Sequence, residues 1–178
     1  MDFQPNLEQT LRSLQAGHLS VEDALEQING VKELGYAAID TDRQRRNGFP
    51  EVIYGEGKTV EQIEGILRFL SEKELPILTT RVSLQKGEAL SQRFPTGHYY
   101  PEARCFVLNS KKEEADPEHY IAVVTAGTSD VPVAEEAAVT AETFGHSVRR
   151  IYDVGVAGIH RLFNRLEEIQ KASVIIVI

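Results

Sequence analysis

The chain has 178 residues, a length that allows one well-packed core or two small domains that share an interface. Its 27 acidic residues outnumber its 19 basic residues, which gives a formal charge of -8. The only compact group of basic residues is Arg43, Arg45 and Arg46. We therefore expect no nucleic acid partner, because binding to phosphate backbones requires a basic face.

The N-terminal segment bears on the cellular location of the protein, and its cysteines and histidines bear on metal binding. The first residues, MDFQPNLEQTLRSL, show no basic stretch followed by an apolar run, and no segment is apolar for long enough to span a bilayer. We expect a cytoplasmic protein with no membrane contact. The single cysteine, Cys105, excludes an intramolecular disulfide and a cysteine-rich zinc site, and the five histidines lack metal-binding spacing. No metal site is predicted.

The first seventy residues predict short helices and one short strand. Leucines at helical spacing between residues 5 and 35 predict two short helices, with a break at Gly17 and a restart at Ser20, where a capping-box pattern begins. Residues 35–57 show little periodicity apart from a strand at 52–54. Thr59, with Gln62 three residues later, then predicts the start of a helix with an apolar face made by Ile63, Ile66, Leu67 and Leu70.

Strands and helices alternate along the rest of the first half. Residues 76–83 predict a strand, residues 86–94 a short helix and residues 103–110 another strand, an alternation that favours an α/β fold. Residues 111–119, KKEEADPEH, are charged, contain a proline and have almost no apolar side chain. They form the predicted linker, so we expect an N-terminal α/β domain over residues 1–110.

Residues 120–178 predict a βαβαβ unit. Strands at 120–126, 146–154 and 173–178 alternate with helices at 132–145 and 158–172. The apolar strands suit a parallel sheet that is buried on both faces. A sheet of only three such strands would leave an apolar edge uncovered, so we expect further chain or another molecule to cover it.

The first candidate site is the segment Thr125 to Asp130, where a strand passes into a helix. Ligands of parallel α/β sheets bind beyond the carboxyl ends of strands, near the unpaired N–H groups of helix N-termini. Gly127 lets the backbone approach an anion, Thr128 and Ser129 supply hydroxyls, and Asp130 can cap the helix or bind a ribose hydroxyl. The alternative is a plain helix cap without a ligand.

The next strand ends at the same edge, in the segment YDVGVAGIHR. Asp153 places a carboxylate at the end of the strand. Gly155 and Gly158 have no side chains and leave room beside the main chain, so the two loops could enclose one ligand. Turn geometry alone would also explain these glycines.

Two basic side chains follow in this segment. His160 could transfer a proton or bind phosphate, or it could simply be exposed at the start of a helix. Arg161 could bind an anion through its planar guanidinium, or it could form a surface pair with Glu167 or Glu168.

Two other features carry weaker hypotheses. Cys105 lies in an apolar strand and is predicted to be an inert core residue and not a nucleophile. A charged cluster is a candidate site for an anion or a partner, with a solvated surface as the alternative; it consists of Asp40, Asp42, Arg43, Arg45 and Arg46.

The segments VVTAGTSDVPVAEEAAVTAE and YDVGVAGIHRLF, preceded by GFPEVIYGEGKTVEQI and TTRVS, resemble the LarB family. That family begins assembly of the nickel-pincer nucleotide cofactor, and related sequences carry the label circadian phase modifier. The resemblance extends from about Gly35 onward, and its C-terminal half is similar to PurE, the phosphoribosylaminoimidazole carboxylase. It implies a small α/β domain followed by the first part of a parallel, flavodoxin-like αβα domain of three layers.

The resemblance also implies a nucleotide site. PurE holds the phosphoribosyl group of its substrate in a Gly-Ser-x-Ser-Asp loop, which AGTSD occupies here. The implied binding residues are Thr125, Gly127, Thr128, Ser129, Asp130, Asp153, Gly155, Val156, Ala157, Gly158, His160 and Arg161. The proton-transferring histidine of PurE falls on Val156, a departure that argues against ordinary purine carboxylase chemistry.

The activity implied by the resemblance is carboxylation of nicotinic acid adenine dinucleotide with carbon dioxide or bicarbonate. Hydrolysis of the phosphoanhydride then releases AMP and the pyridinium-3,5-biscarboxylic acid mononucleotide. The family uses a cysteine thiolate that adds to the electron-poor ring, and this cysteine belongs to a region beyond Ile178. Because Cys105 does not match it, we expect this chain alone to bind the dinucleotide without carboxylating it.

The resemblance bears on cofactors and assembly as well. No cofactor is expected to bind tightly, although magnesium could assist with a diphosphate substrate. The family forms octamers, so we expect a homo-oligomer. Two alternatives stay open: a PurE-like carboxylase or mutase that acts on aminoimidazole ribonucleotide, and a non-catalytic nucleotide-binding regulatory module.

Overall fold

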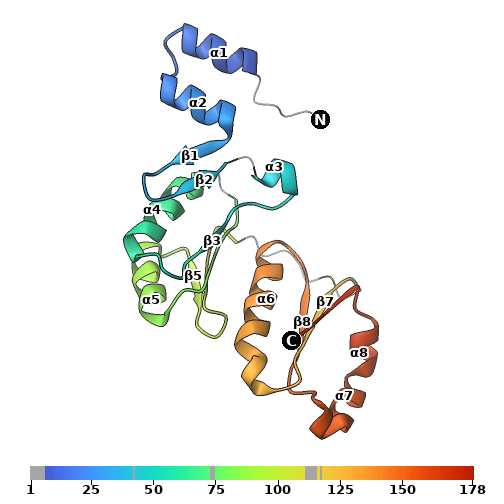
Figure 1. The fold of residues 1–178 in the computed structure, drawn as a ribbon. Helices are drawn as coiled ribbons and strands as arrows, with labels where there is room; N and C mark the ends of the chain where they lie inside the picture. Colours follow the sequence, from blue (N-terminus) through green and yellow to red (C-terminus); the bar gives the residue numbers. More distant parts are fainter. Residues whose placement is uncertain (1–6, 42, 73–74, 111–115, 117) are drawn as a thin grey trace. The chain divides into compact units, whose positions relative to one another are not determined.

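The computed structural model describes residues 7–41, 43–72, 75–110, 116 and 118–178, with the side chain of Arg45 left out. The chain forms two compact units, Met1–Glu51 and Val52–Ile178 (Figure 1). Most of the linker predicted at residues 111–119 lies outside the described residues. Within the described residues, no helix is both long and apolar enough to cross a membrane.

The first unit contains α1 (Leu7–Gln15), α2 (Val21–Asn29), β1 (Val31–Glu33), β2 (Ala38–Asp40) and α3 (Arg43–Asn47). The two predicted helices are confirmed, and Ser20 caps α2 by accepting the Asp23 N–H at 3.0 Å. The antiparallel hairpin of β1 and β2 was not predicted, nor was α3. Strands of three residues are too short for an alternating pattern to appear in the sequence.

The second unit begins with a four-stranded sheet made of β3 (Val52–Tyr54), β4 (Ile77–Thr80), β5 (His98–Tyr100) and β6 (Cys105–Leu108). The strand order is β3-β4-β6-β5, with β3 parallel to β4 and β6 antiparallel to both of its neighbours. Helix α4 (Val60–Ser71) connects β3 to β4, and its predicted capping box of Thr59 and Gln62 is present. Helix α5 (Leu84–Arg93) follows β4.

Strand β5 was not predicted. Its Tyr99 lies directly against Gly87 of α5, where a Cβ would stand 2.5 Å from the tyrosine ring. The glycine therefore permits close contact between the helix and the strand.

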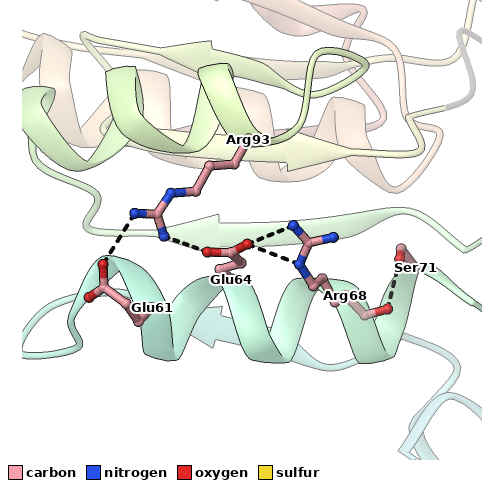
Figure 2. A network of polar contacts seen from close by, with 5 residues as sticks. All are labelled: Glu61, Glu64, Arg68, Ser71 and Arg93. Carbon is pink, nitrogen blue, oxygen red and sulfur yellow. Dashed lines mark hydrogen bonds and ion pairs between the residues drawn. The ribbon is translucent and has the colours of Figure 1, made fainter.

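A polar network joins α4 to α5 (Figure 2). Arg93 of α5 donates to Glu61 at 3.2 Å and also pairs with Glu64. Glu64 in turn accepts two hydrogen bonds from Arg68, at 2.7 and 2.9 Å. Glu64 is thus the shared partner of two arginines, one from each helix.

The second sheet is formed by β7 (Ile121–Val124), β8 (Val148–Ile151) and β9 (Val174–Val177) in the order β8-β7-β9, all parallel. Its helices are α6 (Val131–Thr143), α7 (Ile159–Asn164) and α8 (Leu166–Gln170). This confirms the predicted βαβαβ order and the α/β class. The single helix predicted over 158–172 is wrong, because the Arg165 N–H bonds to Leu162, three residues back, and the helix is interrupted there.

The two faces of the second sheet carry different helices. Val123 packs with Ala134 and Ala138 of α6. The other face, which includes Ala122 and Val124, packs against apolar side chains of α7 and α8, namely Leu162 and Ile169. The result is the three-layered αβα arrangement that the resemblance implied.

Helix α6 is also in contact with the four-stranded sheet. Its Val139 packs with Leu78, Cys105 and Val107 of that sheet. The helix is therefore covered on two sides, which explains its alanine-rich sequence: small side chains let both sheets approach closely, and a helix that is apolar on most sides is a buried one.

Strand β9 forms an edge of the described sheet. Its Val174, Ile175 and Val177 are 51%, 47% and 73% exposed. The apolar edge expected from the sequence is present in the described chain, and its coverage by an assembly stays a prediction.

Candidate functional site

The carboxyl ends of β7 and β8 are joined by main-chain hydrogen bonds beyond the strands themselves. The Thr125 N–H donates to Ile151 at 3.1 Å, the Val154 N–H donates to Thr125 at 3.0 Å, and the Gly155 N–H donates to Ala126 at 2.9 Å. We call Thr125–Asp130 the first corner loop and Asp153–Arg161 the second corner loop. The two predicted loops thus form one structure at one edge of the sheet, as parallel strands require.

Thr125 and Asp153 lock the base of this structure. Thr125 is fully buried, and its hydroxyl oxygen accepts the Asp153 N–H at 3.2 Å. Asp153 has a φ of 58°, a left-handed conformation that aspartate adopts more readily than most residues. Thr125 therefore positions the second corner loop and does not present its hydroxyl at the surface.

Gly155 is required by the contact between the loops. A Cβ at this position would stand 2.6 Å from the Ala126 carbonyl oxygen, closer than any side chain could stay. Gly127 differs, since the atoms nearest to an added Cβ are side-chain atoms of Asp130 and Ser129 at 3.5 and 3.6 Å. Of these two glycines, only Gly155 is required for steric reasons.

Asp130 organises the first corner loop. Its carboxylate accepts the Gly127 N–H at 3.2 Å and the Ser129 hydroxyl at 3.3 Å. Residues 128–130 form a short 3-10 turn that leads directly into α6, which has Pro132 in its first turn. Asp130 stands at the N-cap position of α6, but its side chain makes no capping hydrogen bond to that helix and closes the 3-10 turn through Gly127 instead. Thr128 and Ser129 stay exposed beside the N-terminus of this 13-residue helix.

Arg161 pairs with Asp153 across the second corner loop. The alternative that it pairs with Glu167 or Glu168 is wrong. Those two carboxylates instead pair with Lys171 and Arg165, each at 2.6 Å. An anion that reaches Arg161 would have to compete with the Asp153 carboxylate.

The remaining residues of the second corner loop differ in exposure. Val156 is 88% exposed, and Ala157 and His160 are exposed as well, with His160 in the first turn of α7. Gly158 is buried, and a Cβ there would meet the Arg161 guanidinium at 2.5 Å. An exposed apolar side chain thus stands where the resemblance places the histidine of PurE.

Cys105 is buried in β6 and lacks the solvent access that a nucleophilic cysteine needs. Burial raises the pKa of its thiol to about 12, and the nearby charge of Glu136 contributes in the same direction. The thiolate is therefore not populated near neutral pH, in agreement with the prediction of an inert core cysteine. Among the described residues, no group of three or more His, Cys, Asp or Glu side chains could hold a metal ion.

The charged cluster of the first unit is paired where it is described. Arg46 pairs with Asp40, and Arg43 lies 3.7 Å from the Glu51 carboxylate. Asp42 and the Arg45 side chain lie outside the described residues. The described members of this cluster behave as a surface ion-pair group.

Two contributors to the corner were missed from the sequence. Ala126 and Val154 hold the loops together through their main-chain groups. Main-chain hydrogen bonds do not require a particular side chain, so residue type does not reveal them. The one signal in the sequence is that each of the two residues stands between an apolar strand and a glycine.

Comparison with known proteins agrees with this architecture. The family model of the LarB/PurE-like N-terminal domain matches residues 31–111. An uncharacterised protein of Methanocaldococcus jannaschii, MJ0165, is 32% identical over 181 residues, which cover 97% of this chain and 71% of the relative. The chain belongs to the LarB/PurE-like family. Membership of the LarB/PurE-like family supports a carboxylase-type activity at the level of the family.

Proposed function

We propose that this LarB/PurE-like protein serves LarB-type chemistry, the carboxylation of nicotinic acid adenine dinucleotide by carbon dioxide or bicarbonate. Hydrolysis of the phosphoanhydride would then release AMP and the pyridinium-3,5-biscarboxylic acid mononucleotide. One observation carries the nucleotide-binding part of the proposal. Main-chain bonds from Val154 to Thr125 and from Gly155 to Ala126 join two glycine-bearing loops beside the N-terminus of α6.

This geometry suits a phosphate-bearing ligand. The N-terminus of α6 carries a partial positive charge, and the exposed hydroxyls of Thr128 and Ser129 lie next to it. Asp130 holds the loop in shape through Gly127 and Ser129. In this proposal the first corner loop holds the phosphoribosyl group, and Asp130 positions the loop.

The second corner loop supplies the opposite wall. Arg161 is the cation of that loop and is held there by Asp153. An anionic group of the ligand could exchange with the Asp153 carboxylate, since a guanidinium binds phosphate or carboxylate in the same planar geometry.

Activation of the pyridinium ring needs a thiolate, and Cys105 does not supply it because it is buried with a raised pKa. We therefore assign nucleotide binding, and not ring activation, to the described residues. The proposal further includes a cytoplasmic homo-oligomer that covers β9, and magnesium bound through the diphosphate of the substrate.

Binding tests the site directly. Isothermal titration of the purified chain with nicotinic acid adenine dinucleotide should show weaker binding for Ser129→Ala and Asp130→Ala. Glu167→Gln is the matched control, because its carboxylate lies outside the corner loops and pairs with the exposed Lys171. Undiminished affinity in both corner variants would exclude the site, and preferential binding of aminoimidazole ribonucleotide would favour the PurE-like alternative.

Turnover tests the chemistry. Release of AMP and incorporation of labelled bicarbonate measure turnover, and Ser129→Ala or Asp130→Ala should abolish both. Cys105→Ala should leave binding unchanged, because this thiol is buried in β6. Full turnover in the corner variants would contradict the site assignment.

A further inference from the structure

A group of basic side chains lies at one edge of the four-stranded sheet. We call it the cationic edge and define it as Lys58, Arg81, Lys86 and Arg104. Lys58 follows β3, Arg81 follows β4, Lys86 lies in the first turn of α5, and Arg104 precedes β6. Because β3 and β4 are parallel and β6 is antiparallel to β4, these four positions meet at the same end of the sheet.

Main-chain and side-chain bonds hold these segments together. The Gly55 N–H donates to Thr80 at 2.8 Å, and the Val82 N–H donates to Arg104 at 2.7 Å. The Lys86 ammonium donates to the Gly55 carbonyl at 3.1 Å, and the Lys58 ammonium donates to the Tyr54 carbonyl at 2.9 Å. The edge is therefore a built arrangement of three chain segments and not a run of charges along one element.

The ion pairing of the chain sets this edge apart. Wherever the structure describes a Lys or Arg side chain, that side chain is ion-paired with a carboxylate, with three exceptions: Lys58, Lys86 and Arg104. All three belong to the cationic edge. In a chain with a formal charge of -8, acidic partners are abundant, so cations left without them at one place indicate that another anion is accommodated there.

The carboxylate of Glu56 lies within the field of this edge. The hydrogen bond from the Tyr54 hydroxyl lowers the pKa of Glu56, and the charges of Arg81, Arg104 and Lys86 lower it further. Arg81 itself also pairs with Glu136 of α6 at 2.9 Å. The cations thus outnumber the acidic groups that they face.

The backbone at this edge is strained at both arginines. Arg81 and Arg104 have φ values of 55° and 52°, in the left-handed region that residues other than glycine rarely occupy. Such conformations persist where the surrounding structure holds them, and they are concentrated at ligand sites. Here the bond from Val82 to Arg104 holds the two loops in place.

From these observations we propose that the cationic edge is a binding site for the phosphate group of a small phosphorylated ligand, separate from the corner loops. Lys58 and Lys86 contribute point charges, and Arg104 contributes a planar guanidinium that can bind two phosphate oxygens. The proposal does not depend on carboxylase activity, because it concerns a different sheet and different residues.

The test uses pyrophosphate and AMP as probes, titrated into the full 178-residue chain by calorimetry at low salt. Arg104→Gln and Lys86→Gln should each weaken binding by about two- to five-fold, as expected for partly exposed charges. Glu56→Gln should tighten binding, because it removes a competing carboxylate. Opposite effects from neighbouring substitutions cannot arise from a general loss of folding.

Two controls complete the design. Arg12→Gln removes an exposed, paired arginine of the first unit and should leave binding unchanged. Ser129→Ala alters the corner loop alone and should leave pyrophosphate binding unchanged, even if it weakens dinucleotide binding. Absence of pyrophosphate binding, or binding that ignores Arg104→Gln, Lys86→Gln and Glu56→Gln alike, would overturn the proposal. If AMP binds and pyrophosphate does not, the phosphate-based proposal is likewise overturned.

Discussion

The Ala126 carbonyl oxygen accepts the N–H of Gly155 at 2.9 Å and would stand only 2.6 Å from a side-chain carbon at that glycine. Gly155→Ala should therefore push the two corner loops apart and lower the free energy of unfolding by about 1–3 kcal/mol, the usual cost of overpacking. Urea denaturation measures this loss, and calorimetry should show weaker nucleotide binding.

Gly127→Ala is the matched control in the same corner. Gly127 has a φ of -126°, which alanine adopts freely, and its nearest neighbours would be 3.5 Å away. Its stability should stay within about 0.5 kcal/mol of the wild type, the range of changes that disturb no packed contact. Equal losses in the two variants would show that the close approach at Gly155 has no special role.

Arg150 of β8 should be important for stability. It donates to Glu135 at 3.0 Å and to Glu142 at 2.8 Å, and its side chain is only 32% exposed. Arg150→Ala would leave two partly buried glutamates of α6 without their shared counter-charge, so unfolding free energy should fall by about 1–3 kcal/mol. Thermal or urea unfolding measures the change.

Lys171→Ala serves as the comparison for Arg150→Ala. Lys171 pairs with Glu167 at 2.6 Å, but both side chains are largely exposed, at 67% and 82%. Removal of an exposed pair of this kind should destabilise the protein much less than Arg150→Ala does, because solvent screens both charges. The prediction fails if the two substitutions destabilise the protein equally.

Cys105 should resist alkylation in the folded protein. Its thiol is fully buried, so iodoacetamide at pH 8 should label it in urea but only very slowly in buffer. Rapid labelling of the native protein would contradict the buried position of β6.

The raised pKa of Cys105 also predicts a pH dependence. The folded thiol has a pKa of about 12 against the ordinary 9.0, so the folded state holds the proton more tightly than the unfolded state. This contribution to stability is fully present below about pH 9 and is lost as the pH rises towards the folded value. Wild-type stability should therefore fall more steeply over this range than that of Cys105→Ala, and parallel pH profiles would refute the assignment.

Glu64→Ala should weaken the link between α4 and α5. Glu64 is the partner of both Arg68 and Arg93, so its loss removes two ion pairs at once. The expected loss of stability is small, since surface pairs contribute little, and salt should reduce it. Glu8→Ala, which removes only the exposed pair with Arg12, should cost less, and thermal unfolding at two salt concentrations compares them.

Local signals were sufficient for several elements. The Thr59 and Gln62 capping box and the Ser20 cap were predictable, because each is formed by side chains and N–H groups within three residues of one another. The β1–β2 hairpin and β5 were not predictable, since their strands have three residues each and are defined by partners elsewhere in the chain.

The candidate site was predictable in outline and not in detail. Glycines and hydroxyl residues at two strand ends indicated a shared edge, because parallel strands bring their carboxyl ends together. The pairing of Arg161 with Asp153, and the difference between Gly155 and Gly127, depend on the exact approach of the two loops. Residue type alone does not distinguish these cases.

The sequence by itself determined the βαβαβ order of residues 120–178, the capping residues of α2 and α4 and the identity of the corner residues, because these follow from periodicity and from neighbours along the chain. The tertiary structure alone decided that α6 lies against two sheets, that Thr125 is a buried positioning residue, and that Lys58, Lys86 and Arg104 meet at one edge. These relationships arise from hydrogen bonds between strands and from packing between residues far apart in sequence, neither of which leaves a periodic signal.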